Sequence, residues 1–107
     1  MPVIRVEYDD AVVNEAEARA VCDAVQRAVI EATGIPEVYV WGNTAHIKIN
    51  VEPIEIWVEM SAHKVNDAAV LAKDIRDKLA AWKAEVAFPH LINLTLTPVE
   101  WKLELDI

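Results

Sequence analysis

Cysteine, glycine and proline are scarce in this sequence, with one Cys, two Gly and five Pro among 107 residues. The single cysteine, Cys22, excludes an intrachain disulfide, and its place inside an apolar helical pattern predicts a buried structural thiol. Because hydrophobic residues make up 54% of the chain, the composition also excludes a disordered or low-complexity protein. A chain of this length fits one domain, residues 1–107, that buries its core without disulfides or structural metals.

Basic residues are also few, with ten Lys and Arg against eighteen Asp and Glu, for a net charge of −8. This charge repels a phosphate backbone, so we expect no nucleic-acid partner. No stretch approaches the roughly 18 apolar residues of a membrane span, and the first residues carry no basic segment followed by an apolar run. We therefore expect a cytoplasmic protein without membrane contact.

The first half of the chain reads as strand, helix and strands. Apolar residues alternate over residues 2–8 as in a strand, and recur at helical spacing from residue 14 to about 33. Asn14 and Glu17 form a capping-box pattern at the helix start, and Gly34 ends it. Short strands are predicted at residues 38–41 and 46–51, separated by a Gly42-Asn43 turn.

The second half repeats this order. A strand is predicted over residues 54–60, and a helix beginning at Asn66 and Asp67 carries an apolar stripe from Leu71 to Trp82. Alternation predicts two last strands, at residues 91–97 and 101–107. The residues expected in the core are Ile47, Ile49, Ile56, Val58, Leu71, Ile75, Leu79, Ile92 and Leu94.

The two halves, about residues 2–52 and 53–107, are similar in sequence. Ile-Arg-Val-Glu-Tyr from Ile4 matches Ile-Trp-Val-Glu-Met from Ile56, and Val-Asn-Glu-Ala from Val13 matches Val-Asn-Asp-Ala from Val65, both at an offset of 52 residues. This repeat predicts an α/β (α+β) fold of two βαβ units, with a mainly four-stranded sheet, short extra edge strands and both helices on one face.

The other face of the predicted sheet mixes polar and apolar side chains. Its expected members are Arg5, Glu7, Lys48, Asn50, Glu55, Trp57, Glu59, Asn93 and Thr95. Two arrangements account for such a face: water covers it, as in a ferredoxin-like domain with antiparallel strands, or sister subunits cover it. The direction of the strands within each half distinguishes these two folds.

With its Met1-Pro2 start and its doubled strand–helix–strand order, the chain resembles the tautomerase superfamily over nearly its whole length. Pro53-Ile-Glu-Ile-Trp-Val and the ending Leu-Thr-Leu-Thr-Pro98 before Trp101 are similar to a poorly characterised branch of short tautomerase-fold proteins. The resemblance implies removal of Met1 and a general base at the Pro2 amine, which moves a proton between carbon and oxygen of a small enol or keto compound. It also implies a homotrimer that needs no cofactor.

The chemistry of Pro2 fits such a role. An α-amino group titrates near pH 8, and burial in apolar surroundings disfavours its charged form, which favours a general base near neutral pH. While Met1 is attached, however, the Pro2 nitrogen is an amide that cannot take a proton. If Met1 stays, the expected alternative is a non-catalytic tautomerase-fold trimer or a ligand-binding module.

The arginine that family members place near the site is missing here. Tyr39 is the best substitute, as a neutral donor to a developing enolate oxygen, although packing at a subunit contact is an equally good interpretation. Arg5 and Lys48 are candidates to bind a substrate through their positive charge. The alternative is that both form ion pairs with nearby glutamates. Trp41 and Trp101 are candidates to wall an apolar pocket, or to pack in a core or interface.

Other catalytic classes find no support in the sequence. The three histidines, His46, His63 and His90, lie 17 and 27 residues apart without zinc-site spacing, so we expect no metal. There is no glycine-rich phosphate loop, no G-x-S-x-G and no C-x-x-C, so we expect no nucleotide cofactor or serine-hydrolase chemistry.

Overall fold

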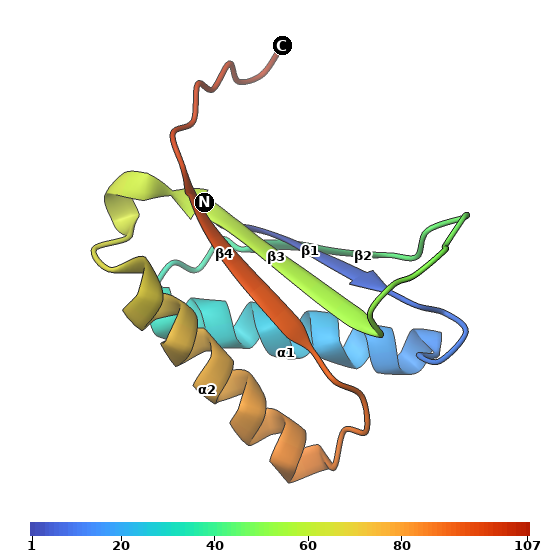
Figure 1. The fold of residues 1–107 in the computed structure, drawn as a ribbon. Coiled ribbons are helices and arrows are strands. Elements are labelled where there is room, and N and C mark those ends of the chain that lie inside the picture. The colour runs from blue at the N-terminus through green and yellow to red at the C-terminus, as the bar shows by residue number, and fades with distance from the viewer.

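A computed structural model describes residues 1–107 as one four-stranded sheet with two long helices on one of its faces (Figure 1). The elements are β1 (Val3–Tyr8), α1 (Glu15–Thr33), β2 (Tyr39–Asn43), β3 (Ile54–Ser61), the 3₁₀ helix η1 (Ala62–Lys64), α2 (Ala68–Val86) and β4 (Asn93–Val99). The strand order is β2-β1-β3-β4. None of the helices has the length and apolar character needed to cross a lipid bilayer.

The strands are parallel within each half and antiparallel between the halves. β1 pairs with β2 and β3 pairs with β4 in parallel, each pair linked by one long helix, whereas β1 and β3 run antiparallel with Ile4 opposite Val58. These pairings confirm the two predicted βαβ units. They also exclude the ferredoxin-like arrangement, in which every strand pairs with its neighbours antiparallel.

The two long helices begin at the predicted caps. The Asn14 side chain accepts a hydrogen bond from the Glu17 backbone N–H at 2.8 Å, and Glu17 accepts one from the Asn14 N–H at 3.0 Å. Helix α1 ends at Gly34, which has a left-handed φ of 70°. Helix α2 begins after Asp67 and ends at Ala87, a non-glycine residue with a φ of 53°.

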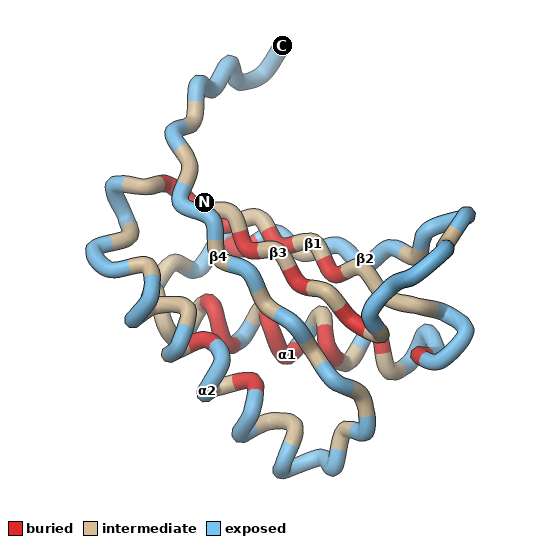
Figure 2. Tube along the Cα trace, viewed as in Figure 1, coloured by how far each residue is buried: buried red, intermediate tan, exposed pale blue.

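The core lies between the sheet and the two helices, where the buried residues of both layers face one another (Figure 2). The expected core residues Ile56, Val58, Ile75 and Leu79 are buried, and the remaining three of the second half are partly buried against them: Leu71, Ile92 and Leu94. The alternation of β1 and β3 therefore places one apolar face of each strand in this core, as predicted.

The predicted strand at residues 46–51 is absent, and Ile47 and Ile49 are not core residues. They are 80% and 98% exposed. β2 ends and β3 begins at the same end of the sheet, on either side of β1, so residues 44–53 only cross the end of β1 and meet no strand edge. Gly42 and Asn43 likewise do not form a turn, because they are the last residues of β2.

The predicted strand at residues 101–107 is also wrong. The chain leaves the sheet after β4, and its last residues form an extended tail that points away from the body (Figure 1). Leu103, Leu105 and Ile107 are exposed there. Alternation alone predicts a strand, but a strand also needs a partner edge, and this part of the chain lies against none.

Candidate active site

Pro2 lies directly before β1, the strand between β2 and β3. Its side chain is fully buried, whereas Met1 is 45% exposed. The Pro2 carbonyl accepts a hydrogen bond from the Tyr39 backbone N–H at 3.1 Å, which ties this end of β1 to the start of β2. Val3 faces Glu59 in the antiparallel register, so one more step places Pro2 opposite the buried Met60. The proline ring is therefore held in an apolar environment at a sheet end.

The Tyr39 side chain lies on the other face of the sheet. Tyr39 pairs with Val3, whereas Pro2 alternates in step with Ile4, which faces the helices. The Tyr39 hydroxyl donates to Glu37 Oε1 at 2.8 Å, and this bond raises the pKa of the tyrosine. Tyr39 thus keeps its proton, but within one chain its hydroxyl points to Glu37 and not to the proline ring.

Arg5 and Trp41 lie in the middle of the open sheet face. The registers place Trp41, Arg5 and Trp57 side by side across β2, β1 and β3. The Arg5 guanidinium carbon lies 5.1 Å from the centre of the Trp57 ring, and its Nη1 is 3.9 Å from Glu7 Oε1. Trp41 is 49% exposed. Arg5 is therefore engaged by an aromatic ring and a carboxylate of its own chain.

Lys48 lies at the opposite end of β1 from Pro2. Its Nζ donates to Asp9 Oδ1 at 2.7 Å and also bonds Asp10. The hydrogen bonds to Asp10 and Asp9 raise the pKa of Lys48, and the bond from Lys48 lowers the pKa of Asp9. Both shifts favour the charged forms, so the groups form an ion pair at neutral pH. Asp9 lies seven positions along the extended chain from Pro2, a span of roughly 20 Å. One chain therefore does not bring Lys48 to the Pro2 amine.

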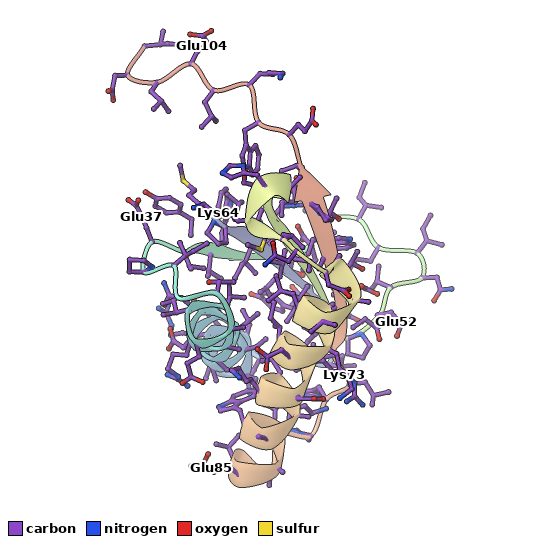
Figure 3. The ribbon with its side chains drawn as sticks, turned by 90° about the vertical axis from the view of Figure 1, so that its left-hand side faces the viewer. Glu37, Glu52, Lys64, Lys73, Glu85 and Glu104 are labelled. Atoms are coloured by element: carbon purple, nitrogen blue, oxygen red, sulfur yellow. The ribbon has the colours of Figure 1, made fainter.

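A hollow on the open sheet face lies between Lys48 and Trp57, the tryptophan that pairs with Arg5. It has a volume of about 450 Å³ and is lined in part by Lys48, Glu55, Trp57 and Thr95. Its wall comes from residues 44–53, and the part that carries Glu52 lies on the far side of the strands from α1 (Figure 3). The hollow opens on the sheet face away from the helices, where polar and apolar side chains are mixed.

Trp101 lies at the Pro2 end of the sheet, beside residues that sequence reasoning missed. It is partly buried and lines a cavity of about 530 Å³ together with Ser61, His63 and Lys102. Ser61 Oγ lies 2.7 Å from His63 Nδ1. A serine and a histidine two residues apart carry no sequence signature, and only the step from β3 into η1 brings the two side chains together.

The remaining titratable groups do not form a metal centre. No three His, Cys, Asp or Glu side chains gather closely enough to hold an ion. His90 Nε2 lies 3.0 Å from Glu17 Oε2, at the start of α1 and away from His63. Cys22 is partly buried, and burial, reinforced by the charge of Asp23, raises the pKa of its thiol, which disfavours the reactive thiolate.

Solved structures share this architecture at low sequence identity. A fused 4-OT asymmetric trimer matches with a TM-score of 0.66 and 14% identity, over 94% of this chain and 91% of that one. FG41 malonate semialdehyde decarboxylase inhibited by 3-bromopropiolate matches at 0.63 and 13%, over 98% and 91%. Macrophage migration inhibitory factor of Toxoplasma gondii matches at 0.59 and 19%, over 98% and 96%.

These neighbours are all proteins of the tautomerase superfamily. The chain has the tautomerase fold. No family model matches the sequence, and no curated protein matches it significantly. At 11% to 19% identity to its structural neighbours, the tautomerase fold is what the likeness shows.

Proposed function

We propose that this tautomerase-fold protein is a cofactor-independent tautomerase or isomerase of small enol or keto compounds. Its general base is the secondary amine of Pro2, freed by removal of Met1. The observation that carries the proposal is the position of Pro2, fully buried at the start of a central strand in this fold. A buried amine favours its neutral form, which is the form that accepts a proton.

The surroundings of Pro2 support this role through geometry. The hydrogen bond from Tyr39 to the Pro2 carbonyl fixes the backbone, and the pyrrolidine ring fixes the direction of the nitrogen lone pair. A base held in one orientation gives up less entropy when the substrate binds. We assign Pro2 as the catalytic residue on these grounds.

Self-association is the second part of the proposal. The chain carries two sets of exposed apolar residues without partners, Ile47, Ile49 and Val51 before β3 and Leu103, Leu105 and Ile107 in the tail. Both alternate like strands, and both edges of the sheet, β2 and β4, are unpaired. A homotrimer would cover these surfaces, and the fused 4-OT neighbours are trimers.

The other predicted site residues fit this assembly better than a single chain. We propose that Tyr39, Arg5 and Trp41, on the open face, act at a site completed by a neighbouring copy, with Tyr39 as the donor to an enolate oxygen. Trp101 would pack against substrate at the Pro2 end of its own chain. Lys48 would contribute charge only to a site on another copy, because its own Pro2 lies at the other end of β1.

The test is the ketonisation of a simple enol acid, such as the enol of phenylpyruvate, followed by ultraviolet absorption. Intact-mass measurement first establishes that Met1 is absent. Pro2→Ala keeps a primary amine but loses the ring, so we expect kcat/KM to fall about 10- to 10³-fold. Loss of the buried ring methylenes should lower the free energy of unfolding by about 1 to 2 kcal/mol, so activity is compared well below both melting temperatures. Pro89→Ala is the matched control, because this exposed proline precedes β4 at the far end of the sheet.

Two results would refute the enzymatic proposal. One is a Met1-free wild type with no activity above buffer on several enol and keto acids, and the other is a Pro2→Ala variant that matches it. A mature chain that still carries Met1 favours the non-catalytic trimer, because its Pro2 nitrogen is an amide.

A further inference from the structure

Pro2 is enclosed by apolar side chains from both neighbouring segments of the sheet. Continuing the strand registers by one residue places Pro2 between Val38, which precedes β2, and Met60 of β3. Val38 is 6% exposed and Met60 is 1% exposed, and all three side chains lie on the face that the helices cover. Met60 is the longer and the more deeply buried of the two neighbours.

Met60 and Pro2 form the closer of the two kinds of antiparallel pair. The Pro2 carbonyl accepts a hydrogen bond from the Tyr39 N–H at 3.1 Å, so it points toward β2 and away from β3. Pro2 and Met60 are therefore not joined by backbone hydrogen bonds, and in such pairs the opposed Cα atoms lie about 4.5 Å apart with their side chains close together. The flexible Met60 thioether thus packs against the ring that contains the amine nitrogen.

The titratable side chains at this end of the sheet stay outside the core around Pro2. They come from α1, β2, β3, η1, the start of α2 and the residues after β4: Glu31, Glu37, Tyr39, Glu59, His63, Lys64, Asp67, Glu100 and Lys102. Tyr39 and Glu59 both pair with Val3 and so lie on the open face, and the others are exposed. Glu37 and Lys64 can be seen at the surface of this end (Figure 3). Apolar groups therefore determine the environment of the Pro2 ring.

We propose that Met60 is a positioning residue for the Pro2 base, an inference that rests on the proposed function. Its side chain holds the pyrrolidine ring in one orientation and excludes water from the β3 side of the ring. Because water stabilises an ammonium ion, a dry wall beside the ring favours the neutral amine, which is the form that accepts a proton. Met60 acts only through Pro2, since a thioether has no proton to exchange.

The experiment measures kcat/KM against pH for Met60 variants of the Met1-free protein in the enol assay. Met60→Gln keeps the length of the side chain but places an amide beside the ring, and the amide oxygen favours the charged amine. We expect the limb on which activity rises with pH to move up by about 0.5 to 1 pH unit, so activity below it falls about three- to tenfold. Met60→Leu, which is apolar and similar in volume, should keep the wild-type profile.

Ile54→Gln is the matched control for the polar substitution. Ile54 is fully buried on the same face of β3 as Met60, but at the other end of the strand, opposite Tyr8. The control therefore places the same amide in the same core, away from Pro2. We expect both glutamine variants to have a lower melting temperature than wild type, and only Met60→Gln to move the rising limb of the pH profile.

The outcomes separate this inference from the function on which it rests. If Pro2→Ala is impaired but Met60→Gln keeps the wild-type limb, or moves it no further than Ile54→Gln or Met60→Leu does, Met60 only stabilises the fold and the inference is overturned. If wild type is inactive, or if Pro2→Ala is unimpaired, the proposed function fails and the inference fails with it. Should Met60→Gln not fold, Met60→Thr decides, because its hydroxyl and the space it leaves admit water beside the ring and should move the limb in the same direction.

Discussion

Replacing Ile49 with serine should weaken self-association without weakening the fold of a single chain. Ile49 is 98% exposed, so it contributes almost no burial to the isolated chain. The free energy of unfolding of a monomer should therefore change by less than about 0.5 kcal/mol. If Ile49 is instead buried at each contact of a homotrimer, each copy gains about 1.5 to 3 kcal/mol from its burial.

The effect on assembly follows from symmetry. A trimer has three equivalent contacts, so the loss of about 2 kcal/mol at each totals about 6 kcal/mol, or roughly 10⁴-fold in the association constant. Because trimer formation depends on the cube of the monomer concentration, the concentration at half-assembly rises as the square root of that factor. We expect a shift of about 100-fold, which is large enough to measure.

Sedimentation equilibrium from about 1 to 100 μM measures this shift. Val70→Ser is the matched control, since Val70 is 65% exposed but lies on α2, in the helix layer. We expect the control to assemble like wild type and Ile49→Ser to dissociate at the low end of the range. A monomer mass for wild type throughout, or assembly of Ile49→Ser as tight as that of wild type, would show that this segment is not an interface.

Two further predictions concern stability. Gly34 and Ala87 each end a 19-residue helix with a positive φ, a conformation that costs a residue with a Cβ about 1 kcal/mol. Ala87→Gly should therefore raise the free energy of unfolding by about 1 kcal/mol, and Gly34→Ala should lower it by a similar amount. An added Cβ at Gly34 would meet no atom within 4 Å, so the backbone conformation alone sets that loss. Urea unfolding measures both, and changes of the same sign would contradict this explanation. Acidification below about pH 4 should lower the melting temperature, because hydrogen bonds from Lys48 to Asp9 and from Asn14 to Glu17 lower the pKa of both carboxyls. That stabilisation is complete above the ordinary carboxyl pKa and is lost as the pH falls through the lowered value, so equal melting temperatures at pH 7 and pH 3 would refute it.

The helix ends, the two central strands and the internal repeat could be predicted from the sequence alone. Helix caps such as Asn14 and Gly34 act within one turn, so their residue types and spacing were enough to place both ends of α1. The apolar alternation of β1 and β3 was equally informative, because one face of each strand is buried in the same core. The 52-residue repeat then led to two βαβ units, whose parallel pairing the structure confirms.

The same alternation was misleading at residues 46–51 and 101–107. A period of two shows that a segment can form a strand with one apolar face, but hydrogen bonding needs a free strand edge alongside, which lies outside the segment itself. The outer edges of β2 and β4 are free, but residues 44–53 cross the end of β1 and the tail leaves the sheet after β4, so Ile49 and Leu105 lie alongside neither edge. Strand pairing depends on the whole sheet and on any neighbouring copy, so a local sequence pattern does not predict it.

Pro2 could be singled out from its place in the sequence, whereas its neighbours could not. Strand direction decides which residues share an end of the sheet, and it separates Lys48 from Pro2 while it places Ser61 on the strand beside it. The contact of Ser61 with His63 likewise depends on the turn from β3 into η1. Local sequence carries the chemistry of each side chain, but the distances between them come from long-range pairing of the strands, which joins residues nearly 60 positions apart.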